Sequence, residues 1–178
     1  MYAIIALFDQ ATEQNIQQVW KELKEESISS YAYEVINRRP HITLASYEKL
    51  NENEFIDLMD QYYKDKRATN ITISSIGSFL NSGTLYYSPT VTNELMELHL
   101  GHHTYFQPFN DNPDSLYLPG KWIPHCTIAN RLTTEKLVEA YVYCLKRSVS
   151  IHGSIKEIAL IKIIDHANSP TVHSVLLK

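Results

Sequence analysis

The sequence lacks the features that mark secreted proteins, membrane-spanning proteins and proteins that bind long nucleic acids. It contains only two cysteines, Cys126 and Cys144, too few for a disulfide framework and typical of a reducing compartment. The formal net charge is −4, so an extended nucleic-acid groove, which needs clustered Lys and Arg, is not expected. A few local cations would still suffice to bind one small or terminal phosphate.

The N-terminus has neither a basic segment nor a long hydrophobic run. Its apolar stretch, residues 2–8, ends at Asp9, which is too early for a signal peptide or a membrane span. We therefore expect a cytoplasmic protein without membrane association. A hydrophobic fraction of 44% and a charged fraction of 20% are ordinary for a globular protein with its own core.

A six-residue segment occurs twice in the chain. Residues 40–45 are Pro-His-Ile-Thr-Leu-Ala, and residues 124–129 are Pro-His-Cys-Thr-Ile-Ala. Side chains of an extended strand alternate between its faces, so each copy is expected to place its His and its Thr on one face. The sequence thus predicts two half-buried strands, each of which presents an imidazole and a hydroxyl to the space between them.

The interval between the copies indicates a duplication of the whole chain. His125 follows His41 by 84 residues, and a shift of this size lays expected strands and helices of one half onto those of the other. The approximate halves, 1–80 and 84–178, each read strand, helix, strand, helix, strand, and 171–177 adds a strand. We expect an α+β fold: a single bilobal domain with two mainly antiparallel sheets, helices on the outer faces and a central cleft.

The two histidines and two threonines of the repeat form a candidate catalytic set (His41, Thr43, His125 and Thr127). Imidazole has a pKa near ~6.5, so one ring can act as a base and the other as an acid near neutral pH. This pair suits in-line displacement at phosphorus, in which one ring deprotonates the attacking water and the other protonates the leaving oxygen. The threonine hydroxyls can donate hydrogen bonds to the phosphate oxygens, where charge accumulates. The scheme requires neither a metal nor a cofactor.

Duplicated His-x-Thr tetrapeptides in a bilobal α+β chain resemble those of the 2H phosphoesterases, the group that contains the 2′-5′ RNA ligases and cyclic nucleotide phosphodiesterases. The resemblance implies a LigT-like fold and the catalytic set named above. It implies a small nucleotide or an RNA terminus with a 2′,3′-cyclic phosphate or a 2′-5′ linkage as substrate. It also favours His125 as the base and His41 as the acid, whereas the residues alone allow either order.

Side chains close to the two motifs are candidates for substrate binding: Arg39, Arg131, Lys121, Tyr47 and Trp122. Arg131 lies one residue further from the second motif than the resemblance would place an arginine. The two aromatic side chains are candidates for stacking on a base. Residues 107–122 are rich in turn formers and are expected to form either a lid over the cleft or a simple connector.

Two other functions remain open at the level of the sequence. The same cleft would serve a non-catalytic module that binds phosphorylated RNA or nucleotide ends. His99 and His103 are four residues apart and could share a helix face as zinc ligands, which would indicate a metallohydrolase. No Glu lies between them in the His-Glu-x-x-His pattern, so we expect His99, His102 and His103 to form a solvated or capping cluster near a helix C-terminus instead.

Overall fold

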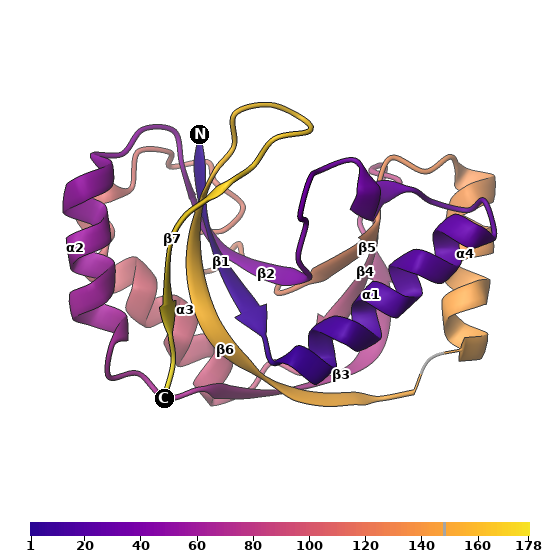
Figure 1. Cartoon of the computed structure of the whole chain (residues 1–178), viewed down its shortest axis with the longest axis horizontal. Helices are drawn as coiled ribbons and strands as arrows, with labels where there is room; N and C mark the ends of the chain where they lie inside the picture. The colour runs from indigo at the N-terminus through magenta and orange to yellow at the C-terminus, as the bar shows by residue number, and fades with distance from the viewer. Residues whose placement is uncertain (148) are drawn as a thin grey trace.

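The computed structural model describes residues 1–147 and 149–178. The described residues form four α-helices, two short 3-10 helices and one seven-stranded sheet (Figure 1). The elements are β1 (Tyr2–Phe8), α1 (Gln10–Glu25), η1 (Tyr31–Tyr33), β2 (His41–Tyr47), α2 (Glu52–Tyr63), β3 (Thr69–Ser78), β4 (Leu85–Pro89), α3 (Asn93–Tyr105), η2 (Gln107–Phe109), β5 (Cys126–Ala129), α4 (Thr134–Arg147), β6 (Ile151–Lys162) and β7 (Thr171–Leu176). No helix among the described residues has the length and apolar character that crossing a membrane requires.

The succession strand, helix, strand, helix, strand occurs twice, from β1 to β3 and from β4 to β6, and β7 follows the second occurrence. Every strand pair of the sheet is antiparallel. The α+β class and the antiparallel pairing predicted from the sequence are confirmed.

The two expected sheets are joined into one by the long strand β6. The strand order is β2-β1-β6-β3-β4-β5, and β7 pairs with β6. Residues 151–155 of β6 pair with β3, and residues 155–162 pair with β1. The last strand of each succession therefore pairs with the first strand of the other, because β3 also pairs with β4.

The helices α1 and α3 also contact strands of the other succession. Helix α1 packs against β5, the second motif strand, and α3 packs against β2, the first motif strand. Figure 1 shows α2 and α3 together on the left flank of the sheet and α1 and α4 together on the right. Each motif strand is thus held in place by a helix from the other succession.

The two motif strands are the outermost strands of the sheet, yet they lie beside each other in the middle of the molecule (Figure 1). The sheet is curved strongly enough to bring its ends together. The buried thiol of Cys126 in β5 even accepts a hydrogen bond from the backbone N–H of His41 in β2. This curvature is what places the two histidines near one another.

Helix α1 has one buried face and one polar face. Asp9 caps its N-terminus, since the Asp9 carboxylate accepts the N–H of Thr12 at 2.9 Å. The inner face buries Ile16, Val19, Trp20 and Leu23. The exposed face carries four glutamines and Lys21, and three of these glutamines border the largest hollow described below.

Candidate functional site

The motif strands alternate as the sequence predicts. In β2, His41 and Thr43 are half-buried, whereas the intervening Ile42 is completely buried. In the second copy Thr127 is likewise half-buried and follows the buried Cys126. The His and Thr side chains of each strand therefore share the face that is open to a ligand.

Both imidazoles make the same hydrogen bond. Nδ1 of His41 lies 2.7 Å from the carbonyl oxygen of Arg39, and Nδ1 of His125 lies 2.7 Å from that of Ile123. A carbonyl oxygen can only accept, so Nδ1 carries the hydrogen in each neutral ring and Nε2 keeps its lone pair. Neither Nε2 has a hydrogen-bond partner among the described residues, so both are available to take or give a proton.

The repeated proline explains why this bond recurs. The accepting carbonyl belongs in each case to the residue before the motif proline, Pro40 or Pro124. A proline restricts the preceding residue to extended conformations, which limits the directions in which that carbonyl can point. The proline, the carbonyl and the imidazole therefore form one unit that sets the orientation of the ring.

The electrostatic surroundings of the two rings differ. The pKa of His41 is lowered to about 4, mainly by burial and also by the positive charges of Arg38 and His125, against the raising effect of the Arg39 carbonyl. Burial also lowers the pKa of His125, opposed by the Ile123 carbonyl. The charge of one imidazole reaches the other, so the two rings lie within electrostatic range across the cleft.

The two tryptophans of the chain hold the two motif strands from outside. Trp122 Nε1 donates to the carbonyl oxygen of Thr43 at 2.9 Å, and Trp20 Nε1 donates to that of Thr127 at 3.3 Å. Both carbonyls belong to strands at the ends of the sheet, where backbone groups need partners from outside the ladder. Trp122 was expected to stack on a base, but its ring stacks on His99 at 3.9 Å between centroids.

The half-buried Tyr117 and the buried Tyr31 approach the threonine side chains in a parallel manner. The Tyr117 hydroxyl interacts with the side chain of Thr43, and the Tyr31 hydroxyl interacts with that of Thr127. Burial nevertheless raises the pKa of both tyrosines, so both phenols keep their protons. Each threonine hydroxyl thus has a fixed neighbour that orients it.

Each histidine borders its own hollow. The His41 hollow has a volume of about 180 Å³ and an aliphatic wall made by Ile5, Leu7, Ile161 and Ile163. The His125 hollow has a volume of about 230 Å³ and is lined by Phe79, Leu116, Tyr117, Lys121 and Ile123. The rings of Phe79 and Tyr86 lie 4.8 and 5.3 Å from the His125 ring, measured between centroids.

Comparison with known proteins identifies the family. The family model of the 2′-5′ RNA ligase superfamily matches residues 9–167. The chain belongs to this superfamily. No curated protein sequence matches the chain.

Solved structures share the fold of this superfamily member. A Thermus thermophilus protein, TT0787, superposes with a TM-score of 0.66 at 12% identity, over 99% of this chain and 97% of its own. E. coli LigT in its apo form superposes with a TM-score of 0.64 at 10% identity, over 99% and 96%. LigT complexed with 3′-AMP superposes with a TM-score of 0.63 at 11% identity, over 99% of this chain and 97% of its own. At these identities the likeness shows the fold, and it confirms the LigT-like fold implied by the sequence.

The structure distinguishes the two neighbouring arginines by their partners, although both line the His41 hollow. The Arg39 guanidinium is bound to the carboxylates of Glu13 at 2.8 Å and Glu157 at 2.9 Å, so its charge is already neutralised. Arg38 has no acidic partner among the described residues. Its guanidinium lies 3.9 Å from the centre of the Tyr31 ring, its Nε is buried without a hydrogen-bond partner, and it borders the His41 hollow.

Sequence reasoning missed Arg38 in this superfamily member. The dipeptide Arg38-Arg39 gives no local signal for which guanidinium is free. The two glutamates that bind Arg39 come from α1 and β6, which the fold alone brings to it. Arg38, rather than the paired Arg39, is the candidate for phosphate binding, and only the tertiary structure distinguishes the two.

The other predicted binding residues lie in three different places. Arg131 is paired with Glu34 and borders a hollow that neither motif histidine lines. Tyr47 is buried in the core with its hydroxyl 2.7 Å from His102 Nε2, which corrects its expected role in stacking. Lys121 alone borders the His125 hollow, with its ammonium 3.1 Å from the carbonyl of Pro113.

The expected solvated cluster of histidines on α3 is wrong, because all three rings are buried. His102 lies between the hydroxyls of Tyr47 and Tyr63, each 2.7 Å away. His99 Nε2 donates to the carbonyl of residue 117 at 2.8 Å, and His103 Nε2 donates to that of residue 44 at 3.0 Å. In the part of the chain that the structure describes, no three His, Cys, Asp or Glu side chains gather as a metal site would require.

The segment 107–122 is anchored to the end of the first motif strand. The Asp111 carboxylate accepts the backbone N–H groups of Glu48 and Lys49, the latter at 2.8 Å. The hydroxyls of Ser115 and Ser46 are 3.1 Å apart. These contacts favour the connector over the lid, because a lid would have to break them to open.

Proposed function

We propose that this superfamily member is a phosphoesterase that acts on 2′,3′-cyclic phosphate or 2′-5′ phosphodiester ends of RNA or nucleotides. One observation carries the proposal: two imidazoles on facing strands make the same Nδ1 hydrogen bond and keep both Nε2 atoms free. A structure of the similar protein LigT contains 3′-AMP, a nucleotide with a terminal phosphate, which supports a ligand of this class.

His41 is the base and His125 the acid in this proposal. The pKa of His41 is lowered to about 4 by burial and by the nearby charges of Arg38 and His125, so this ring is neutral and accepts a proton from water. No positive charge contributes to the lowered pKa of His125, so the negative charge of a bound phosphate more easily favours the form of this ring that has taken a proton from solvent. This order reverses the one that the resemblance implied.

The reaction then balances with two proton transfers. Water loses a proton to Nε2 of His41 and its oxygen forms a bond to phosphorus, while the bond from phosphorus to the ribose oxygen breaks. Nε2 of His125 gives its proton to that leaving oxygen. Thr43 and Thr127 donate hydrogen bonds to the non-bridging oxygens, and Arg38 offsets their negative charge. Solvent returns both rings to their starting states.

The test is a screen of 2′,3′-cyclic mononucleotides and 2′-5′-linked dinucleotides against the parent protein, His41→Ala and His125→Ala. Each substitution is expected to lower kcat by about 10²–10⁴-fold, the usual contribution of a general acid or base. His152→Ala is the matched control, because His152 is an exposed histidine of β6 outside the cleft.

Two outcomes would contradict the proposal. Activity that persists in both motif variants would show that the imidazoles are not the catalytic groups. A parent protein that binds phosphorylated nucleotide ends without turnover, and whose variants bind equally well, would instead be the non-catalytic binding module. Far-UV circular dichroism of each variant checks that lost activity does not reflect lost folding.

A further inference from the structure

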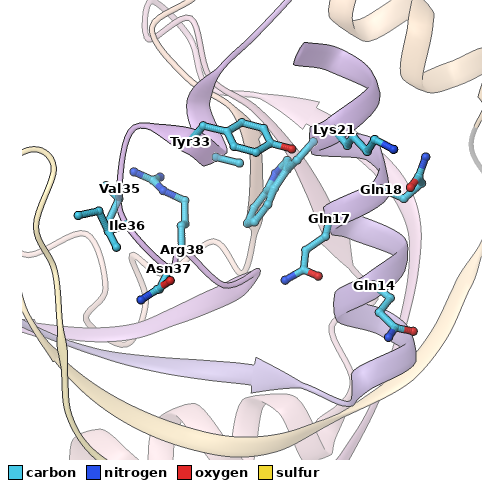
Figure 2. Close-up of a pocket in the computed structure, with 11 residues that line it drawn as sticks. Gln14, Gln17, Gln18, Lys21, Tyr33, Val35, Ile36, Asn37 and Arg38 are labelled. Carbon is cyan, nitrogen blue, oxygen red and sulfur yellow. The ribbon is translucent and has the colours of Figure 1, made fainter. Parts of the chain in front are cut away.

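A hollow of about 650 Å³ lies between α1 and residues 32–38 (Figure 2). Trp20 lines it from α1, and Figure 2 shows Gln17 reaching from the same helix toward the segment of Asn37 and Arg38. Tyr33, which is 51% exposed, extends toward α1 on a third side. The amide of Gln17 has no hydrogen-bond partner among the described residues, so it is free to bind a ligand.

The size of this hollow sets it apart from the hollows at the two histidines. Ligand sites commonly have volumes of about 300–1000 Å³. The hollows at His41 and His125, with about 180 and 230 Å³, are smaller than this range. They suit a reacting phosphate and part of one nucleoside, whereas the α1 hollow is large enough for a further nucleotide.

The α1 hollow adjoins the proposed catalytic site. Residues 35–38 line both the α1 hollow and the His41 hollow. Arg38 belongs to this shared wall, and its charge acts on the imidazole of His41. Trp20 connects the hollow to the second motif, since its indole N–H bonds to the carbonyl of Thr127. The hollow therefore lies next to the place where the two imidazoles would hold a substrate.

The lining of the hollow fits a negatively charged nucleotide. The chain contains 20 acidic residues, yet no carboxylate lines the hollow, whereas Lys21 and Arg38 do. Arg38 lacks an acidic partner among the described residues, although the exposed Lys21 has Glu25 at 3.7 Å. Single-stranded RNA is recognised by stacking on aromatic rings and by hydrogen bonds to base edges, which Tyr33 and the amides of Gln17 and Asn37 can supply.

We propose that the α1 hollow binds the nucleotide adjacent to the reacting one, so that the substrate is an oligonucleotide end of at least two nucleotides. Tyr33 stacks on the base of that nucleotide, and Gln17 and Asn37 bind its edge, while Arg38 stays beside the reacting phosphate. This inference rests on the proposed function for its orientation, because the reacting end is placed at His41 and His125.

The experiment compares a dinucleotide that ends in a 2′,3′-cyclic phosphate with the corresponding cyclic mononucleotide. Stacking of one base is worth about 1–3 kcal/mol, so the parent is expected to favour the dinucleotide by about tenfold or more in kcat/KM. Gln17→Glu places a carboxylate in the hollow and Tyr33→Ala removes the ring. Both are expected to remove this preference without changing the rate on the mononucleotide, and the effect of Gln17→Glu should weaken at high salt.

Asn15→Asp is the matched control, because Asn15 is an exposed amide of α1 that does not line the hollow. A parent without preference for the dinucleotide, or variants that slow both substrates alike, would overturn the inference. If the parent hydrolyses neither substrate, the proposed function fails. Calorimetric binding of a dinucleotide 3′-phosphate then tests whether the α1 hollow binds a nucleotide. Weaker binding to Gln17→Glu than to Asn15→Asp would support it, and equal binding would refute it.

Discussion

The two copies of the motif have the same backbone geometry in different surroundings. Both imidazoles bond to the carbonyl before the motif proline, and both threonine carbonyls accept an indole N–H. Around His41 the wall is aliphatic and Arg38 adds a positive charge. Around His125 the wall is aromatic, with Phe79 and Tyr86 against the ring.

This difference shows how a duplicated site can hold an acid and a base made of the same residue. The repeated hydrogen bond fixes which nitrogen of each ring faces the ligand. The surrounding charges and burial then decide which ring holds the proton. An acid–base pair needs its two members to differ in this second property, and residues outside the six-residue repeat provide the difference.

The largest expected effect comes from changing the leaving group in the two histidine variants. A nitrophenolate leaves as a stable anion and needs no proton, so a nitrophenyl phosphodiester does not require the acid. His125→Ala is expected to recover most of its about 10²–10⁴-fold loss on this substrate, whereas His41→Ala is not. Recovery in His41→Ala alone would reverse the assignment of acid and base. Equal recovery in both would remove the distinction between the two rings.

The next effect separates Arg38 from Arg39. Arg38→Met removes the unpaired charge beside His41 and is expected to lower kcat/KM by about 10–100-fold, as loss of a charge-stabilising donor commonly does. Arg39→Met leaves Glu13 and Glu157 unpaired, with side chains only 13% and 15% exposed, and should cost about 1–3 kcal/mol of unfolding free energy. Steady-state kinetics and urea unfolding measure the two effects separately.

The substitution Arg38→Met also has a defined effect on the pH profile of kcat/KM. Burial is the main cause of the low pKa of His41, and the Arg38 charge contributes to it, so Arg38→Met raises that pKa. A base must be unprotonated to act, so the acidic limb of the kcat/KM profile should move to higher pH while the alkaline limb stays. A shift of the alkaline limb would indicate that His41 is the acid. Arg39→Met should move neither limb.

The sequence predicted those parts of the site that depend on local order. The alternation of His and Thr with apolar residues, the antiparallel strands and the α+β class all follow from spacing within short segments. The 84-residue shift also anticipated the repeated order of elements. These features are encoded by neighbours in the chain, so the sequence alone was sufficient for them.

Partners from distant segments could not be predicted in this way. Arg39 was expected to bind the substrate, but its charge is paired with Glu13 and Glu157 although it lines the His41 hollow. Tyr47 was expected to stack on a base, but it is buried and bonds to His102. The crossing of α1 and α3 onto the opposite motif strand has no local signal, so the hollow beside α1 was missed. Its sequence trace is the run of glutamines on the exposed face of α1, which by itself reads as an ordinary solvated surface.

The smallest expected effect tests whether the outer supports of the two motif strands are equivalent. Phe in place of Trp keeps most of the ring but removes the N–H to the threonine carbonyl, and a lost hydrogen bond costs about 0.5–1.5 kcal/mol. Trp122→Phe should cost more than Trp20→Phe, because the lost hydrogen bond is 2.9 Å long at Trp122 and 3.3 Å long at Trp20. Urea unfolding gives the stabilities, and kcat should fall several-fold in both variants, since each threonine hydroxyl depends on the position of its strand. If both stabilities fall but kcat is unchanged, the indoles support the fold without orienting the threonines, and the symmetry of the two motifs ends at their histidines.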